Sequence, residues 1–243
     1  AVKGVSFSIR QGEILGLAGV SGNGQNELAQ VLNGTRDALS GTVTFDEVPV
    51  QLYHPAALVD TGWGRIPEDR MTEGVVLEMS LTENCLLEVH NRPAFRNSIF
   101  IDFKAAKQHT QTLIEQYNIR PTIADNPVHN LSGGNIQKLI LAREFSLNPR
   151  LIIASQPTRG LDVKAVSFIQ TLLLEAKERG TGILLISEDL DEIMKLSDRI
   201  AVIYEGEIMD ILDRKDASRT KIGRLMAGIR NSENQLEGQR HED

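Results

Sequence analysis

Residues 14–26 read ILGLAGVSGNGQN, and this stretch indicates an α/β architecture. Its first five residues form a continuous apolar run, which is typical of a strand covered on both faces of a parallel sheet. Gly19, Gly22 and Gly24 follow and predict a tight turn, after which helical periodicity runs from about Asn26 to Asn33. A strand that enters a helix through such a turn presents free backbone N–H groups, which favour an anion.

The turn matches the glycine positions of the phosphate-binding P-loop, G-x-x-x-x-G-K-[ST], but not its last two positions. Gln25 occupies the lysine position and Asn26 the Ser/Thr position. The cation that contacts the β- and γ-phosphates and the hydroxyl that holds Mg²⁺ are therefore both replaced by amides. Two interpretations stay open: a degenerate nucleotide loop, or a strand-to-helix turn without a ligand.

Two more apolar runs, at 151–154 and 183–186, predict buried strands. Between them, residues 163–179 have helical periodicity and end at Gly180, a helix stop. A strand, a helix and a second strand of this kind form a βαβ unit, so the fold class is α/β with a mostly parallel sheet.

The middle of the chain has a different pattern, with long helical stretches and few strands. We expect a helical subdomain inserted at about 62–148, and its predicted helices cover 81–90, 102–117 and 138–147. Residues 43–52 predict a small antiparallel hairpin. The nucleotide-binding domain is expected to cover 1–228.

Both ends of the chain carry expectations of their own. Ala1 to Ile9 alternate as a strand does, and because this begins at the first residue we expect a piece cut from a longer polypeptide. Residues 229–243 are polar and predict a disordered tail.

Composition limits the classes of function. A net charge of −7 and a pI of about 5.3 argue against a dedicated nucleic-acid binder, which usually has a basic face.

The only cysteine is Cys85, so no intrachain disulfide can form, and a buried structural role explains it. No apolar run has the roughly 20 residues of a membrane-spanning helix. The histidines form no metal-binding pattern, so no metal site of the chain's own is expected: His54, His90, His109, His129 and His241.

Residues 131–138, LSGGNIQK, place Ser132, Gly133 and Gly134 at a predicted helix start, where a hydroxyl and free N–H groups face an anion. Here the sequence resembles the ABC ATPase family, whose signature is LSGG followed by Gln, and the LSGGN-x-QK form is similar to simple-sugar and nucleoside importers. The resemblance implies that these three residues, with Gln137, contact the γ-phosphate of ATP held by a partner cassette.

Residues 151–162, LIIASQPTRGLD, resemble the family's Walker B strand and the D-loop after it. The family has Asp, which orders Mg²⁺, and Glu, which activates the attacking water, where this chain has Ser155 and Gln156. Glutamine matches glutamate in size but is not a base, so it cannot accept the proton of water. Asp162 fits the D-loop aspartate, which contacts the partner cassette.

Two further segments depart from the family or carry no assigned role. Glu188 follows the strand at 183–186, where the family has a histidine that contacts the γ-phosphate. Residues 65–70, RIPEDR, resemble a stretch of sugar and nucleoside importers that lies at the family's Q-loop, but no glutamine matches, and an exposed charged loop is equally open.

The departures all fall in the cassette's own ATP site, whereas the residues that serve the partner's site are kept. The resemblance covers about residues 1–212 and implies an importer subunit for nucleosides or simple sugars, with a degenerate ATP site. ATP is then bound weakly or not at all in its own site, and Mg²⁺ accompanies only the partner's ATP.

The expected partners are a second cassette, fused as an N-terminal half, membrane permease subunits and, indirectly, a periplasmic or lipoprotein solute-binding protein. The expected location is the cytoplasmic face of the membrane, as a peripheral subunit, with no nucleic acid bound. The alternatives are a self-sufficient ATPase, a non-transport ABC protein and a nucleotide-free interaction module.

Overall fold

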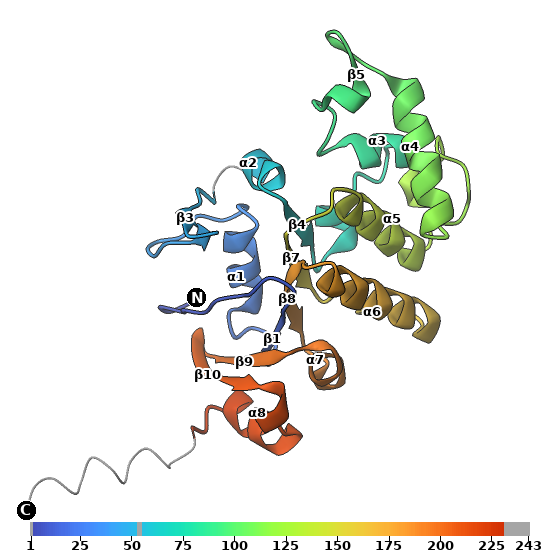
Figure 1. Ribbon diagram of the computed structural model, residues 1–243. Coiled ribbons are helices and arrows are strands. Elements are labelled where there is room, and N and C mark those ends of the chain that lie inside the picture. The colour runs from blue at the N-terminus through green and yellow to red at the C-terminus, as the bar shows by residue number, and fades with distance from the viewer. Residues whose placement is uncertain (1, 53–54, 231–243) are drawn as a thin grey trace, which may run out of the picture.

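A computed structural model describes residues 2–52 and 55–230, and its main sheet has six strands within those residues, in the order β10-β9-β1-β8-β7-β4 (Figure 1). Five strands are parallel, and β10 pairs with β9 in the antiparallel direction. The strands are β1 Ile14–Ala18, β4 Trp63–Ile66, β7 Leu151–Ser155, β8 Gly182–Ser187, β9 Arg199–Tyr204 and β10 Glu207–Asp213. The predicted α/β class is confirmed.

Helices cover both faces of this sheet, which explains the continuous apolar runs in its strands. Along β8, Ile183 and Leu185 pack into one hydrophobic cluster and Leu184 and Ile186 into another on the opposite face. The first cluster also receives side chains from the helices α5 Gly133–Ser146, α6 Val163–Glu178, α7 Leu190–Leu196 and α8 Arg219–Met226. The second receives α1 Gln25–Leu32 and α2 Pro55–Asp60.

A small hairpin of β2 Thr44–Phe45 and β3 Val48–Pro49 lies beside α1 and confirms the hairpin expected at 43–52 (Figure 1). Residues 2–9, by contrast, form no strand in the described part of the chain, so that expectation is wrong. Val5, Phe7 and Ile9 alternate because they pack on the cluster around α1. Alternating apolar residues show only that one face of the segment is apolar. Such a face can be buried against other side chains even when the backbone forms no hydrogen bonds with a neighbouring strand.

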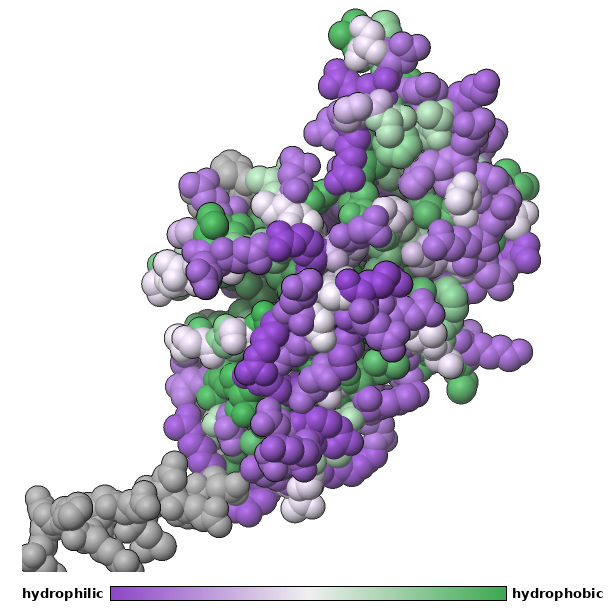
Figure 2. Space-filling model, viewed as in Figure 1, coloured by the Kyte–Doolittle hydropathy of each residue, from purple (hydrophilic) through white to green (hydrophobic). Residues whose placement is uncertain are grey.

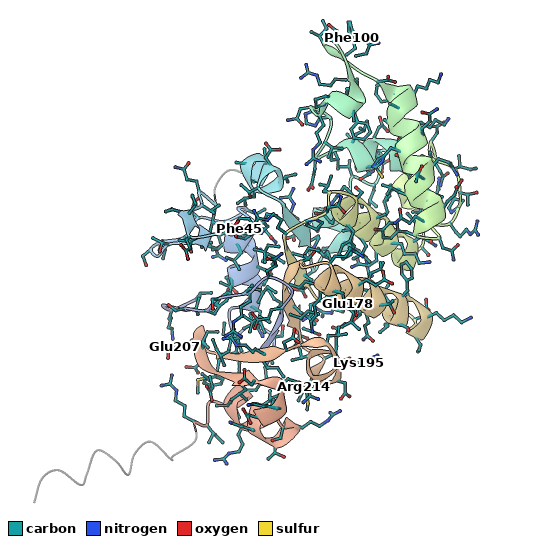
Figure 3. The ribbon with its side chains drawn as sticks, viewed as in Figure 1. Phe45, Phe100, Glu178, Lys195, Glu207 and Arg214 are labelled. Carbon is teal, nitrogen blue, oxygen red and sulfur yellow. The ribbon has the colours of Figure 1, made fainter. Side chains whose placement is uncertain are left out.

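The helical part projects from one edge of the sheet, and Figure 3 marks Phe100 near its outer end. Its elements are α3 Leu81–Leu86, β5 Arg96–Asn97, β6 Phe100–Ile101 and α4 Phe103–Gln116. The helices α3 and α4 pack with α5, and β5 pairs with β6. The first strand in the expected range 62–148, β4, pairs with β7 and belongs to the main sheet. Figure 2 shows a mostly hydrophilic face, with apolar side chains at the tip of the β5–β6 hairpin.

Two predicted helices have different bounds in the structure. The helix expected at 81–90 ends at Leu86, and that expected at 138–147 begins at Gly133, so the whole Ser-Gly-Gly run lies at its N-terminus. Four short single turns complete the part of the fold that the structure describes: η1 Arg70–Gly74, η2 Pro93–Phe95, η3 Val128–Asn130 and η4 Arg214–Asp216.

Within the described residues, no helix combines the length and the apolar character that crossing a bilayer demands. Most of the expected disordered tail, residues 231–243, lies outside the described residues.

Candidate functional site

The glycine-rich turn links β1 to α1 in a shape that needs its glycines. Gly22 and Gly24 have φ angles of 84° and 109°, which side chains rarely adopt. A Cβ at Gly19 would lie 2.5 Å from Gln25 Nε2 and 2.7 Å from Ile203 Cγ2, so this position has no room for one. Gln25 is buried and its Nε2 donates to Val20 O at 3.0 Å, back toward the turn itself.

A pocket opens at this turn, at the carboxyl ends of β1, β7 and β8, and the predicted residues meet there. The register places Ala18 beside Ser187, and Ser155 beside Ile186. The lining residues are Ser21, Gly22, Gln25, Asn26, Glu68, Ser155, Gln156, Ile186, Ser187 and Glu188. The side chains predicted at the P-loop end, Walker B and switch positions therefore converge, although Gly19 and Gly24 do not line the pocket.

The charged residues that line this pocket are all acidic. Among the lining residues, all of them described, Glu68 and Glu188 are acidic and none is lysine or arginine. Ser155 Oγ is buried with no hydrogen-bond partner among the described residues. Gln156 has a φ of 47°, and its Oε1 accepts a hydrogen bond from Glu188 N at 3.3 Å. Within the described residues, no three His, Cys, Asp or Glu side chains form a group that could hold a metal ion.

The signature residues lie elsewhere, at the exposed N-terminus of α5. Ser132 is the N-cap residue, but its side chain caps no backbone N–H within the described residues. Its Oγ instead accepts a hydrogen bond from Asn135 Nδ2 at 2.9 Å. Ser132 and Gly133 are exposed, and a Cβ at Gly134 would meet nothing within 4 Å in the described part of the chain. The hydroxyl hydrogen and the first N–H groups of the helix are thus free to bind an outside group.

Gln137, which was grouped with the signature residues, does not share their exposed position. Its side chain is 2% exposed, and its Nε2 donates to Pro157 O at 2.9 Å. The reason is its depth in the helix, because Gln137 lies a full turn inside α5, where the helix packs on the protein, whereas Gly133 is at the free N-terminus. Gln137 therefore ties α5 to the turn after β7.

Asp162 is the N-cap residue of α6 and is exposed. Its carboxylate accepts hydrogen bonds from Lys164 N at 3.0 Å and Ala165 N at 3.1 Å. The neighbouring Val163 is 85% exposed, although it is apolar. Asp162 stabilises the start of α6 as its cap, and the apolar Val163 is exposed beside it. Both features are compatible with a contact surface at this turn.

The segment at 65–70, to which the sequence assigned no role, makes long-range contacts. Arg65 Nη2 pairs with Glu88 Oε1 at 2.8 Å, and Glu68 pairs with Arg159, which is 91 residues away. Arg70 Nη2 donates to Arg159 O at 2.9 Å. The segment thus joins the pocket, through Glu68, to the turn that leads into Asp162.

Glu192 is a buried carboxyl group that sequence reasoning missed. Thr158 Oγ1 donates to its Oε1 at 2.8 Å, while its Oε2 is buried without a partner among the described residues. Burial raises the pKa of Glu192, and the nearby Asp189 charge acts in the same direction. Glu192 lies in the first turn of α7, where an acidic side chain is common on an exposed helix end, so only the packing of α7 reveals its burial.

Comparison with known proteins is consistent with this arrangement. The model of the ABC transporter family matches residues 2–159. The glucose import ATP-binding protein TsgD13 of Haloferax volcanii is 41% identical over 230 residues, which are 94% of this chain and 42% of that protein. The nucleoside import ATP-binding protein NupA of Lactococcus lactis is 40% identical over 227 residues, or 93% of this chain and 45% of NupA. The chain thus spans less than half the length of these relatives.

Solved structures show the same fold. The ATP-binding cassette MJ0796, as a dimer bound to ADP and Pi, superposes with a TM-score of 0.74 at 20% identity, over 88% of this chain and 90% of that one. A nucleotide-free cassette from an ABC transporter gives a TM-score of 0.72 at 23% identity, over 88% and 86% of the two chains. From the family match and this fold, the chain belongs to the ABC transporter family.

Proposed function

We propose that this chain is an ATP-binding cassette of an importer for nucleosides or simple sugars, that its own ATP site does not hydrolyse ATP, and that its signature completes the site of a partner cassette. One observation carries the proposal. The residues that depart from the family line a single pocket, whereas Ser132 to Gly134 and Asp162 lie outside that pocket, with Gly134 half-buried and the others exposed.

The residues of the pocket do not fit a Mg²⁺–ATP complex poised for hydrolysis. Mg²⁺ prefers carboxylates with phosphate oxygens, and the end of β7 offers Ser155 and Gln156 instead. No lysine accompanies the phosphates, because Gln25 replaces it. Glu188 adds repulsion of about 4 kcal/mol per unit charge for a phosphate about 4 Å away, at an effective dielectric of about 20. ATP binding in this site is therefore weak or absent.

The signature, in contrast, keeps the groups that bind phosphate. The N-terminus of α5 has free N–H groups and no acidic residue in its first turn. Because Ser132 Oγ accepts from Asn135, its hydrogen can point outward to an anion. These groups serve a phosphate held by another cassette, and Mg²⁺ is bound together with that ATP.

The names of similar proteins support a proposal for the assembly. Proteins similar to this chain are named as glucose, nucleoside, guanosine and ribose import ATP-binding proteins. We infer that the chain works at the cytoplasmic face of the membrane with permease subunits and, indirectly, a solute-binding protein. The active partner is a second cassette, fused as an N-terminal half. Nucleic acid has no part in this function.

The test is ATP turnover by the isolated chain and by the chain with its partner cassette. The chain alone is expected to be inactive, and to raise turnover by the partner. Ser132→Arg abolishes that gain, because it places a bulky cation at the signature. Thr112→Arg, on the exposed surface of α4, is the matched control and keeps the gain.

Two results contradict the proposal. Turnover by the isolated chain at an ordinary rate indicates a self-sufficient ATPase with another base. No effect on the partner, together with no nucleotide binding, indicates an interaction module.

A further inference from the structure

Arg70 lies between the signature and the turn that leads to the D-loop. A Cβ added at Gly133 would be 3.8 Å from Arg70 Cζ and Nε, and one added at Gly160 would be 3.5 Å from Arg70 Nη2. The same Nη2 donates to Arg159 O at 2.9 Å. The guanidinium therefore lies beside both the signature and the turn before Asp162.

This position places one positive charge beside another. The N-terminus of α5 carries the positive end of the helix dipole, and no acidic side chain occurs in its first turn. A cation placed beside it adds like charge. A structure that keeps such a local conflict usually does so at a functional site.

The two acidic residues that precede Arg70 in the sequence make their own hydrogen bonds elsewhere. Glu68 pairs with Arg159, and Asp69 accepts hydrogen bonds from Met71 N at 2.9 Å and Thr72 N at 3.2 Å. Within residues 2–52 and 55–230, Arg70 makes no ion pair of its own. Hydrogen bonds from Thr72 and Met71, and then the Arg70 charge, lower the pKa of the neighbouring Asp69. No carboxylate of the described residues bonds the guanidinium itself, which stays beside the first N–H groups of the signature.

We propose that Arg70 is a positioning residue for the phosphate that the signature receives from the partner cassette. It adds a positive charge next to Ser132 and Gly133, and it fixes the D-loop turn to the signature through Arg159 O. This inference rests on the proposed function, because it concerns the same trans site.

The chemistry of arginine suits this double role. Guanidinium has five N–H donors in a rigid plane, so one can hold Arg159 O while others face an anion. Nε and Nη1 make no hydrogen bond within the described residues. Lysine would keep the charge but lose the planar geometry that spans both segments.

The assembled importer, with both cassettes and its permease, provides the test. Arg70→Gln is compared with Arg70→Lys, with Ser132→Arg, and with Arg96→Gln on the β5–β6 hairpin as the matched control. Steady-state ATP hydrolysis is measured at low and high salt, and thermal unfolding checks that each variant folds.

We expect Arg70→Gln to lower kcat/KM for ATP about tenfold, mainly through a higher KM, because a hydrogen bond or close charge toward a phosphate is lost. Arg70→Lys recovers most of the loss, and Arg96→Gln changes little. The Arg70→Gln importer also loses part of its salt dependence, since one positive charge at the phosphate site is gone.

The outcomes separate this inference from the proposed function. If Ser132→Arg abolishes turnover while Arg70→Gln leaves KM and salt dependence unchanged, the role of Arg70 is refuted and the trans site stands. If lysine fails as badly as glutamine, or if only kcat falls, charge toward the phosphate is not what Arg70 supplies. If Ser132→Arg has no effect, the proposed function itself is wrong.

Discussion

Glu144 of α5 offers a test of how the helical part is held to the sheet. Its side chain is fully buried, with Oε1 paired to Arg143 Nε at 2.9 Å and Oε2 accepting from Arg65 N at 3.0 Å. Arg143 is also buried, and its Nη1 donates to Gly74 O at 3.0 Å. Glu144→Ala therefore leaves a buried guanidinium without its carboxylate and a backbone N–H of β4 without its acceptor.

The expected loss of stability is large because water cannot solvate a buried charge that has lost its partner. Breaking one side of a buried ion pair costs about 3–5 kcal/mol. For a chain of this size, about 2–4 °C of melting temperature corresponds to each kcal/mol, so the midpoint falls by about 6–20 °C. Arg143→Met with Glu144→Gln removes both charges and keeps an acceptor for Arg65 N, so it costs less than Glu144→Ala alone.

Urea denaturation followed by circular dichroism, together with a thermal scan, measures these differences. Ser146→Ala is the control in the same helix, because it removes one hydrogen bond, from Ser146 Oγ to Arg143 O at 2.7 Å. It should cost about 0.5–1.5 kcal/mol. A loss below about 1 kcal/mol for Glu144→Ala would refute the reasoning, because it would mean that water solvates Arg143 at little cost.

Three other predictions test single features of the fold. Burial raises the pKa of Glu192 in the folded state above 4.5, so the folded protein keeps this carboxyl group protonated at a pH where the unfolded chain has lost the proton. The stability of the wild type should therefore fall relative to Glu192→Gln as pH rises from about 4.5 through the higher folded pKa. Urea midpoints that stay parallel for the two proteins across that range would argue against this. Cys85 is 3% exposed and burial raises its pKa to about 11, so a thiol reagent at neutral pH should modify it only as the protein unfolds, and rapid labelling of the native protein would contradict this. Gly16→Ala brings a Cβ to 2.3 Å from Ser197 Oγ and should cost about 1–3 kcal/mol in urea denaturation, whereas Gly134→Ala should change stability by less than about 1 kcal/mol; equal costs would be evidence against this packing.

The elements that were predicted well are those with a strong local pattern. The strands at 151–154 and 183–186 and the helix at 163–179 agree with β7, β8 and α6 to within a residue or so. Errors arose where one pattern has two physical meanings. Residues 2–9 alternate because one face packs on the core, and β4 lies in the main sheet although its neighbours along the chain are helical.

The chain alone determined the strand, glycine turn and helix at 14–32, and the chemical identity of Gln25, Ser155, Gln156 and Glu188. Hydrophobic periodicity and side-chain chemistry can be read from neighbouring residues. The order of several motifs along the chain then indicates the family. The negative charge of the pocket, however, includes Glu68, which no spacing links to the other residues.

Only the tertiary structure decided which distant residues meet. It buried Gln137 under the turn after β7, paired Glu68 with Arg159 across 91 positions, and placed Arg70 beside Gly133. The physical reason is that the strand order sets these contacts: β4 lies beside β7, so the segments that follow both strands emerge at the same edge. The separation of two residues along the chain does not indicate whether the folded sheet brings them together.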